Sequence, residues 1–192
     1  MKRTQRNLLI ILSVAALLWL VLRALPPSAA LGIAVGLFAA GSTLCVWGRD
    51  FLIGRYRMKR RAWQQARASF ERFEQKLLRN RSSSLLIPLY LGIYSFDGVA
   101  IARNNIGVCL MNLRDLDEAV RWLRSALQRD PLYPVPYINL ATIAALRNDA
   151  ATAQREMRRA VDLGYSPAGA QLLLRRLLAR ANETAGRTLD GP

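Results

Sequence analysis

Residues 104–131 read NNIGVCLMNLRDLDEAVRWLRSALQRDP, and residues 137–167 read YINLATIAALRNDAATAQREMRRAVDLGYSP. When the chain is laid over itself so that Asn105 falls on Asn139, the two stretches carry small, apolar or amide residues at the same positions. The other pairs are Ile106 with Leu140, Gly107 with Ala141, Ala119 with Ala153, Leu123 with Met157, and Ala126 with Ala160. The sequence therefore predicts two copies of one helix-turn-helix unit.

The pattern indicates an all-α protein. Apolar residues recur at helical spacing, and no stretch shows sustained alternation of β-branched residues. Small residues at fixed positions let neighbouring helices cross closely, and large apolar residues fill the remaining space.

These residues resemble the tetratricopeptide repeat family. Ile106 and Gly107 resemble the family's Leu-Gly pair, and Pro131 resembles its terminal proline. The other matches are Ala119, Leu123 and Ala126 in the first unit, and Tyr137, Leu140, Ala141, Ala153, Met157 and Ala160 in the second. Pro167 departs from the pattern, because it comes two residues late. The resemblance implies a short superhelical stack whose first helices line a groove, which in the family generally binds a peptide or protein segment.

The resemblance also implies which residues line the groove. They are Ile101, Asn104, Asn105, Val108, Met111, Asn112, Val135, Ile138, Asn139, Thr142 and Leu146. Asn105 and Asn139 are one repeat apart, so their amides could hold an extended peptide backbone. The alternative is that asparagine is simply frequent there in the family. The lysines with which some members clamp a C-terminal carboxylate are absent, and Arg103 and Arg147 are the nearest substitutes.

The repeat domain is expected to cover residues 82–181. Counting back once more by the same shift, the helices ending near Asn80 and Phe96 can be read as a degenerate first repeat, with Leu89 and Gly92 at its large and small positions. After the second unit, Ser166-Pro167 predicts the start of a C-terminal capping helix. Residues 182–192 are expected to form a flexible tail.

Two apolar stretches precede the repeats. Leu8–Leu22 and Ala29–Trp47 contain no charged residue, and Pro26 and Pro27 lie between them. The second stretch is long enough as a helix to match a hydrocarbon core of about 30 Å. The first is shorter, but Arg23 can snorkel to the interface. We expect residues 1–48 to form a two-helix transmembrane hairpin.

Basic residues predict the orientation of this hairpin. They gather on its two outer sides, at Lys2, Arg3 and Arg6 and at Arg49, Arg55, Arg57, Lys59, Arg60 and Arg61. The positive-inside rule then places both termini and the repeat domain in the cytoplasm. We expect the membrane to be the inner (plasma) membrane of a bacterium. The alternative is a cleaved secretory signal over residues 1–30, which would still leave Leu31–Trp47 as an anchor.

Residues 49–81 are predicted to form a basic, amphipathic juxtamembrane helix. Residues 48–81 hold eleven basic and three acidic residues, a net charge of +8 within the chain's total of +15. We expect the basic residues to contact anionic lipid rather than nucleic acid, because such clusters follow from membrane topology. The apolar stripe comprises Trp63, Ala66, Phe70, Phe73 and Leu77. It is expected to pack on the repeat domain rather than to form a coiled-coil dimer, because two heptads make a short seam.

The composition does not favour an enzyme. The chain has no histidine, which removes the commonest general base and metal ligand, and it has no glycine-rich phosphate loop. The acidic cluster of Asp115, Asp117 and Glu118 falls at a predicted helix start, where such residues act as caps. We expect no catalytic residue, cofactor or metal. Cys45 and Cys109 are expected to be buried thiols in a reducing compartment.

The predicted function is that of a membrane-anchored adaptor or scaffold that binds a protein partner through its groove. The alternative is a membrane-surface module that binds anionic lipid or nucleic acid through the basic helix. Gly32 and Gly36 have the GxxxG spacing of some membrane dimers, so a homo-oligomer is a further possibility.

Overall fold

The computed structural model describes residues 3–29, 31–33, 35–36, 48–79, 95, 97–173 and 175. These residues contain helices and no strand, which confirms the prediction of an all-α protein. The helices are α1 (Arg3–Ala24), α3 (Arg49–Lys59), α4 (Trp63–Arg79), α6 (Gly98–Asn112), α7 (Leu116–Arg129), α8 (Pro134–Leu146) and α9 (Ala150–Asp162).

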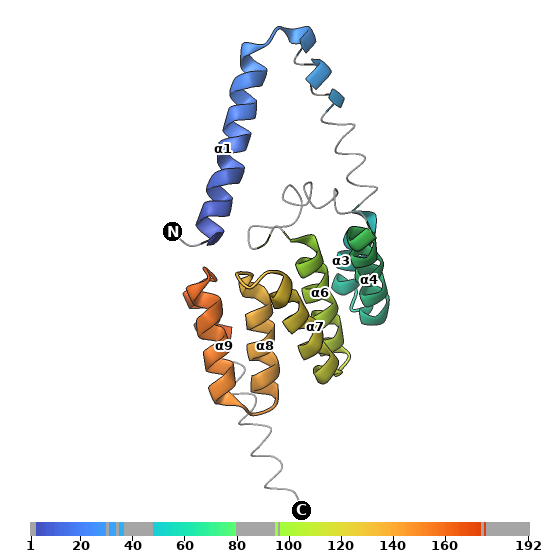
Figure 1. Ribbon diagram of the computed structural model, residues 1–192, viewed down its shortest axis with the longest axis vertical. Coiled ribbons are helices and arrows are strands. Elements are labelled where there is room, and N and C mark those ends of the chain that lie inside the picture. Colours follow the sequence, from blue (N-terminus) through green and yellow to red (C-terminus); the bar gives the residue numbers. More distant parts are fainter. Residues whose placement is uncertain are drawn as a thin grey trace, which may run out of the picture.

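Six of these helices form antiparallel hairpins, α3 with α4, α6 with α7, and α8 with α9, which lie side by side (Figure 1). The second helix of each hairpin packs against the next hairpin, since α4 contacts α6 and α7 contacts α8. These six helices therefore form a short helical solenoid, in which each unit is stabilised by its neighbours.

The three hairpins share one kind of turn. The first helix ends in a Schellman motif, with Arg61, Arg114 or Asn148 in the left-handed region at φ 56°, 68° and 60°. In each hairpin, the backbone N–H of the residue after this one donates to the carbonyl oxygen five residues before it. In the second hairpin the bond joins Asp115 to Leu110 at 3.0 Å. These bonds satisfy carbonyls that would otherwise be unpaired at a helix end.

The hairpin of α3 and α4 is a third copy of the repeat. Laid over the second hairpin, it pairs Gly54 with Gly107, Ala66 with Ala119, Phe70 with Leu123 and Arg61 with Arg114.

The degenerate first repeat expected from the shift between the later hairpins is therefore in the wrong register. The chain from Ala66 to Gly107, which joins the first two hairpins, is longer than the equivalent chain from Ala119 to Ala141. A constant shift cannot find the first copy across this longer connection. Leu89 and Gly92, on which the expected repeat relied, lie outside the described residues.

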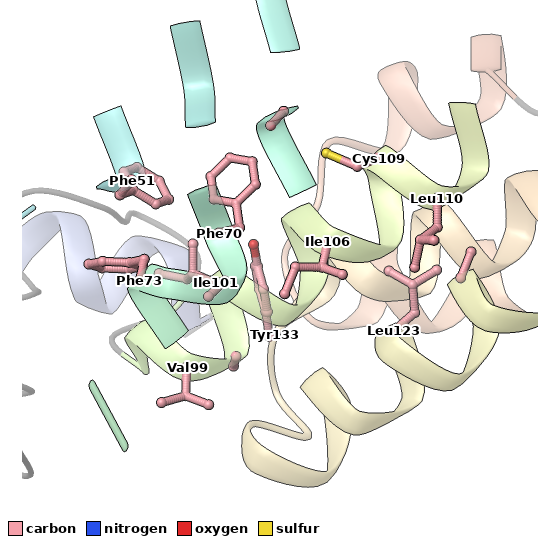
Figure 2. Close-up of a cluster of buried hydrophobic side chains, with 14 of the residues drawn as sticks. Phe51, Phe70, Phe73, Val99, Ile101, Ile106, Cys109, Leu110, Leu123 and Tyr133 are labelled. Carbon is pink, nitrogen blue, oxygen red and sulfur yellow. The ribbon is translucent and has the colours of Figure 1, made fainter. Parts of the chain in front are cut away.

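The first two hairpins share one hydrophobic core, shown in Figure 2. It extends from Phe51 of α3, whose ring centroid lies 5.6 Å from that of Phe70 and 5.3 Å from that of Phe73, to Leu110 and Leu123. Its smaller members close the helix crossings, because Ala66 and Ala119 are fully buried.

The stripe predicted on α4 packs into this core, and no coiled coil is needed to bury it. Ala66, Phe70, Phe73 and Leu77 are at most 5% exposed. The expected division between residues 49–81 and 82–181 must therefore be corrected. Residues 49–79 are not one separate helix, but two helices that belong to the solenoid and share its core with α6 and α7.

A further helix begins at the predicted position after α9. Gly164 forms the last Schellman turn at φ 105°, and residues 167–173 are helical. Ser166 Oγ accepts a hydrogen bond of 3.3 Å from the N–H of Gly169, as an N-cap does. Ala170, which is 1% exposed, packs with Ile138 and Met157, so this helix covers the last hairpin. The predicted tail lies outside the described residues.

Helix α1 stands apart from the stacked hairpins, with residues 25–29 at its farther end (Figure 1). No helix among the described residues is both long and apolar enough to span a membrane. Most of the second predicted span, Ala29–Trp47, lies outside the described residues.

Candidate functional site

The exposed face of the first helices is the candidate binding surface. Three positions of each hairpin fall on this face, which we call the groove face. They are Arg55, Met58 and Lys59 of α3, Val108, Met111 and Asn112 of α6, and Thr142, Ala145 and Leu146 of α8. Ala145 is 1% exposed, so it adds no accessible surface to this face. The α3 residues were missed in the sequence, although Gly54, Ala66 and Phe70 carried the same spacing as Gly107, Ala119 and Leu123.

The eleven predicted groove residues differ in exposure. Asn112 and Leu146 are exposed, and five are half-buried: Val108, Met111, Val135, Asn139 and Thr142. The other four are at most 8% exposed: Ile101, Asn104, Asn105 and Ile138. The expectation that Asn105 lies open in the groove is wrong, because its side chain is 8% exposed. The accessible part of the groove face along α6 and α8 therefore combines apolar side chains, Val108, Met111 and Leu146, with the polar side chains of Asn112 and Thr142.

The asparagines of neighbouring repeats contact each other. Asn139 Nδ2 donates a hydrogen bond of 2.8 Å to Asn104 Oδ1. Asn104 is 4% exposed, so the bond satisfies a buried acceptor. This bond joins α6 to α8. It occupies the Asn104 side-chain oxygen and one N–H of the Asn139 amide within the solenoid, so neither is offered to a ligand.

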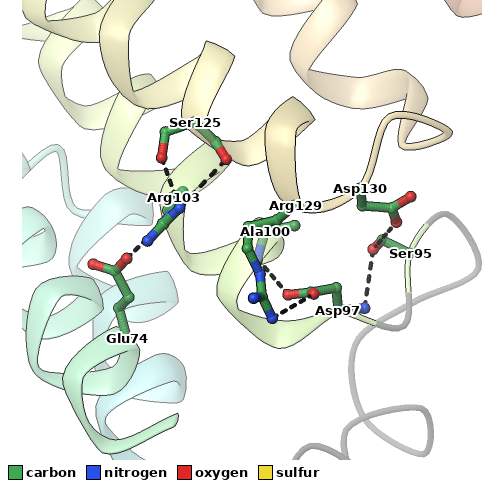
Figure 3. A network of polar contacts seen from close by, with 8 residues as sticks. All are labelled: Glu74, Ser95, Asp97, Ala100, Arg103, Ser125, Arg129 and Asp130. Carbon is green, nitrogen blue, oxygen red and sulfur yellow. Dashed lines mark hydrogen bonds and ion pairs between the residues drawn. The ribbon is translucent and has the colours of Figure 1, made fainter. Parts of the chain in front are cut away.

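The two arginines considered as substitutes for clamp lysines have partners elsewhere. Arg103 Nε lies 2.6 Å from Glu74 Oε1, and Arg103 Nη1 donates to Ser125 Oγ at 2.7 Å (Figure 3). Arg147 forms an ion pair of 2.6 Å with Asp117 on α7. Arg103 therefore ties α4, α6 and α7 together.

A second polar network fixes the start of α6. Asp97 caps the helix by accepting from the N–H of Ala100 at 2.8 Å, and it pairs with Arg129 at 3.0 Å. Ser95 Oγ donates to Asp130 Oδ2 at 2.6 Å, and both residues are buried (Figure 3). These contacts hold the first helix of the second hairpin against the end of its second helix.

The six residues predicted to face lipid are spread over more than one face of α3 and its two ends. Arg49 lies at the first residue of α3, and Arg60 and Arg61 follow its last residue, so the two ends are about 16 Å apart at 1.5 Å per residue. Arg57 is half-buried and donates to Ser69 Oγ at 2.8 Å. Arg55 and Lys59 are exposed and belong to the groove face.

Asp50 fastens the two helices of the first hairpin. It forms ion pairs with Lys76 and with Arg72 of α4. Burial alone would raise the pKa of Asp50, but the hydrogen bonds and charges of Lys76 and Arg72 outweigh it, so the pKa lies below its ordinary value. Because Asp50 pairs with Lys76 and Arg72 of α4, it does not neutralise the arginines of α3.

The described residues contain no group of three or more histidine, cysteine, aspartate or glutamate side chains that could hold a metal ion. Asp115, the first of the predicted acidic cluster, is the N-cap of α7 and accepts from the N–H of Glu118 at 3.2 Å. Its cap role, predicted from the sequence, is confirmed. Cys109 is buried, and burial raises the pKa of its thiol to about 12.

No protein-family model matches the chain, and a search of the curated proteins finds none similar to it.

Proposed function

We propose that this protein is a membrane-anchored adaptor whose groove face binds a segment of a partner protein. The observation that carries the proposal is the register of the three hairpins. It aligns equivalent side chains of α3, α6 and α8 along one face, and leaves Met111 half-buried and Leu146 46% exposed. The accessible side chains of α6 and α8 on this face are apolar at Val108, Met111 and Leu146 and polar at Asn112 and Thr142. Such a mixed surface on an open face of a solenoid suits an extended or helical segment.

The groove face carries positive charge at one end. Arg55 and Lys59 of α3 are exposed, and they form no ion pair within the part of the chain that the structure describes. Toward α8 the face becomes neutral, with Thr142 and Leu146. The bound segment would therefore place acidic residues beside α3 and apolar residues beside α6 and α8.

The exposed surface of α1 supports anchoring in a membrane. Its residues 8–22 carry no charge. The large apolar side chains of this stretch whose exposure is described are between 44% and 64% exposed: Leu9, Leu12, Val14, Leu17, Trp19, Leu20 and Val21. A surface of this kind is costly in water and is typical of contact with lipid or with another protein.

The runner-up is a membrane-surface module that binds anionic lipid or nucleic acid through α3. It is favoured by the exposed side chains of Arg49, Arg60 and Arg61 at the two ends of this helix.

The test uses the full-length chain, because α4 shares its core with α6 and a fragment starting after α4 would expose that core. The variant Met111→Ser with Leu146→Ser removes apolar surface from the groove face. We expect recovery of the partner by affinity capture from solubilised membranes to fall at least about tenfold, which corresponds to about 1.4 kcal/mol.

The matched control is Arg121→Ser with Gln128→Ser, on the exposed surface of α7. It should leave capture unchanged, and thermal unfolding should show that both variants fold. A third variant, with Arg49, Arg60 and Arg61 changed to glutamine, all outside the groove face, should bind anionic vesicles less well without losing the partner. If this variant alone abolishes capture, the groove proposal is wrong and the runner-up replaces it.

A further inference from the structure

The outward face of α3 carries an apolar stripe that nothing in the described structure covers. Leu52 is 47% exposed and Tyr56 is 57% exposed, and the two lie one helical turn apart. This stripe is separate from the groove face, since Arg55 and Lys59 lie about 60° to 100° away from Tyr56 around the helix.

The equivalent positions in the other two hairpins are buried, except for Asn139, which also corresponds to Leu52 and is half-buried. Leu52 corresponds to Asn105, which is 8% exposed. Tyr56 corresponds to Cys109 and Ile143, which are 0% and 2% exposed. These positions are covered by the second helix of the preceding hairpin: α4 packs on α6, and α7 packs on α8.

Helix α3 has no preceding hairpin among the described residues, so its stripe is a stacking surface without a stacked unit. Terminal repeats of solenoids ordinarily carry a polar outer face. The opposite end follows this rule in part, because a further helix buries Ala170 against the last hairpin. The first hairpin instead presents a leucine and a tyrosine.

The charge around the stripe is uniformly positive. Arg49 and Arg60 lie within about 40° of Tyr56 around α3, and Arg60 Cζ is 5.2 Å from the centroid of the Tyr56 ring. Both arginines are exposed, and neither forms an ion pair within the described residues. The acidic residue of α3, Asp50, is engaged by Lys76 and Arg72 of α4.

We propose that this face docks an amphipathic helix of a second partner protein. The partner helix would carry an apolar stripe bordered by aspartate or glutamate. This helix would pack on Leu52 and Tyr56 as α4 packs on the equivalent positions of α6, and its carboxylates would pair with Arg49 and Arg60. A second copy of this chain is a poorer fit, since it would bring like charges together. The surface and its partner are independent of the groove face.

The experiment places a photo-crosslinking residue in the full-length protein as Tyr56→p-benzoylphenylalanine, and irradiates the native cells. The control carries it as Arg121→p-benzoylphenylalanine, on α7, where the side chain is 77% exposed. Adducts are digested, and mass spectrometry locates the attached group. A third site, Met111→p-benzoylphenylalanine, reports on the groove face separately.

The expected result is an adduct at position 56, absent from the Arg121 control, in which the attached peptide lies in a helix whose apolar stripe is bordered by acidic residues. Adding Arg49→Glu and Arg60→Glu should lower its yield at least about fivefold, because like charges then face each other. Lysines in place of the partner's acidic residues should restore it. An adduct with a second copy, with lipid only or with any other kind of protein segment overturns the proposal. So does the absence of an adduct in a variant that unfolds at the wild-type temperature.

Discussion

Gly107 lies directly beneath Leu123, so close that a Cβ atom on Gly107 would be 2.8 Å from Leu123 Cγ. The first hairpin repeats this relationship with other side chains, because a Cβ on Gly54 would be 2.8 Å from Phe70 Cε1. In both hairpins the glycine permits two helices to cross closely while a large side chain of the second helix fills the crossing.

In Gly107→Ala the added methyl overpacks the crossing, which should cost about 1–3 kcal/mol. The better helix propensity of alanine returns about 1 kcal/mol, so we expect the free energy of unfolding to fall by up to about 2 kcal/mol. The matched control is Gly169→Ala, whose Cβ would meet nothing closer than 3.6 Å. Chemical denaturation measures both, and equal stability of the two variants would contradict the packing described for Gly107.

The bond between Asn104 and Asn139 should be energetically coupled. In a double-mutant cycle of Asn104→Ala and Asn139→Ala, we expect a coupling of about 0.5–1.5 kcal/mol, the net contribution of one hydrogen bond. The control cycle joins Asn139→Ala with Asn112→Ala, because the Asn112 amide donates to Val108 of its own helix. A coupling near zero in the first cycle would mean that the repeats are not joined by these amides.

Removal of the Arg103 side chain should be far more costly than removal of an exposed arginine. In Arg103→Met the carboxylate of Glu74, which is 6% exposed, loses its cation while it stays buried. The expected loss is about 3–5 kcal/mol. Arg147→Met is the matched control, since the side chain of its partner Asp117 is 92% exposed, and it should cost less than about 1 kcal/mol. Thermal unfolding of the two variants gives the comparison, and losses of similar size would argue against the buried pair.

The thiol of Cys109 should be protected in the folded protein. Burial raises its pKa to about 12, so at pH 8 it is almost entirely the unreactive thiol. In a Cys45→Ser background, we expect a thiol reagent to react at least about 100-fold more slowly with the native protein than with the protein in denaturant. A rate in the native protein equal to that of a free cysteine would show that α4 does not cover Cys109.

The proposed membrane topology can be tested with two exposed positions. In the Cys45→Ser background, Ser28→Cys should react with an impermeant maleimide in intact cells, whereas Gln128→Cys should react only after the membrane is opened. The basic residues outside the two apolar stretches are the reason for this expectation. Labelling of Gln128→Cys in sealed cells would place the repeats on the other side of the membrane.

Helices α6 to α9 were predictable because each hairpin has local signals. Asp115 and Asp149 cap α7 and α9, and the positions matched between the two hairpins all recur at one constant shift. The first hairpin was not predicted, because the longer chain between it and the second hairpin changes the sequence shift that aligns the two. In addition, Phe73 lies at the position where the later hairpins have alanine.

The site was harder to predict. Helical spacing shows on which face of its helix a side chain lies, but it does not show which residue of another helix that side chain contacts. Spacing placed Asn105 and Asn139 on one face of the stack. Burial of Asn105 and the bond from Asn139 to Asn104 depend instead on how the repeats stack.

The sizes of the paired residues at the three helix crossings also bear on how the helices pair during folding. The first hairpin combines Gly54 with Phe70, and the second combines Gly107 with Leu123. The third has alanine and methionine at the same two positions. A helix that paired with the wrong hairpin would meet either an overfilled crossing or a void. The three crossings therefore have the same backbone arrangement but differ in the side chains that fill them, which favours the native pairing of helices over their exchange between units or between copies during folding.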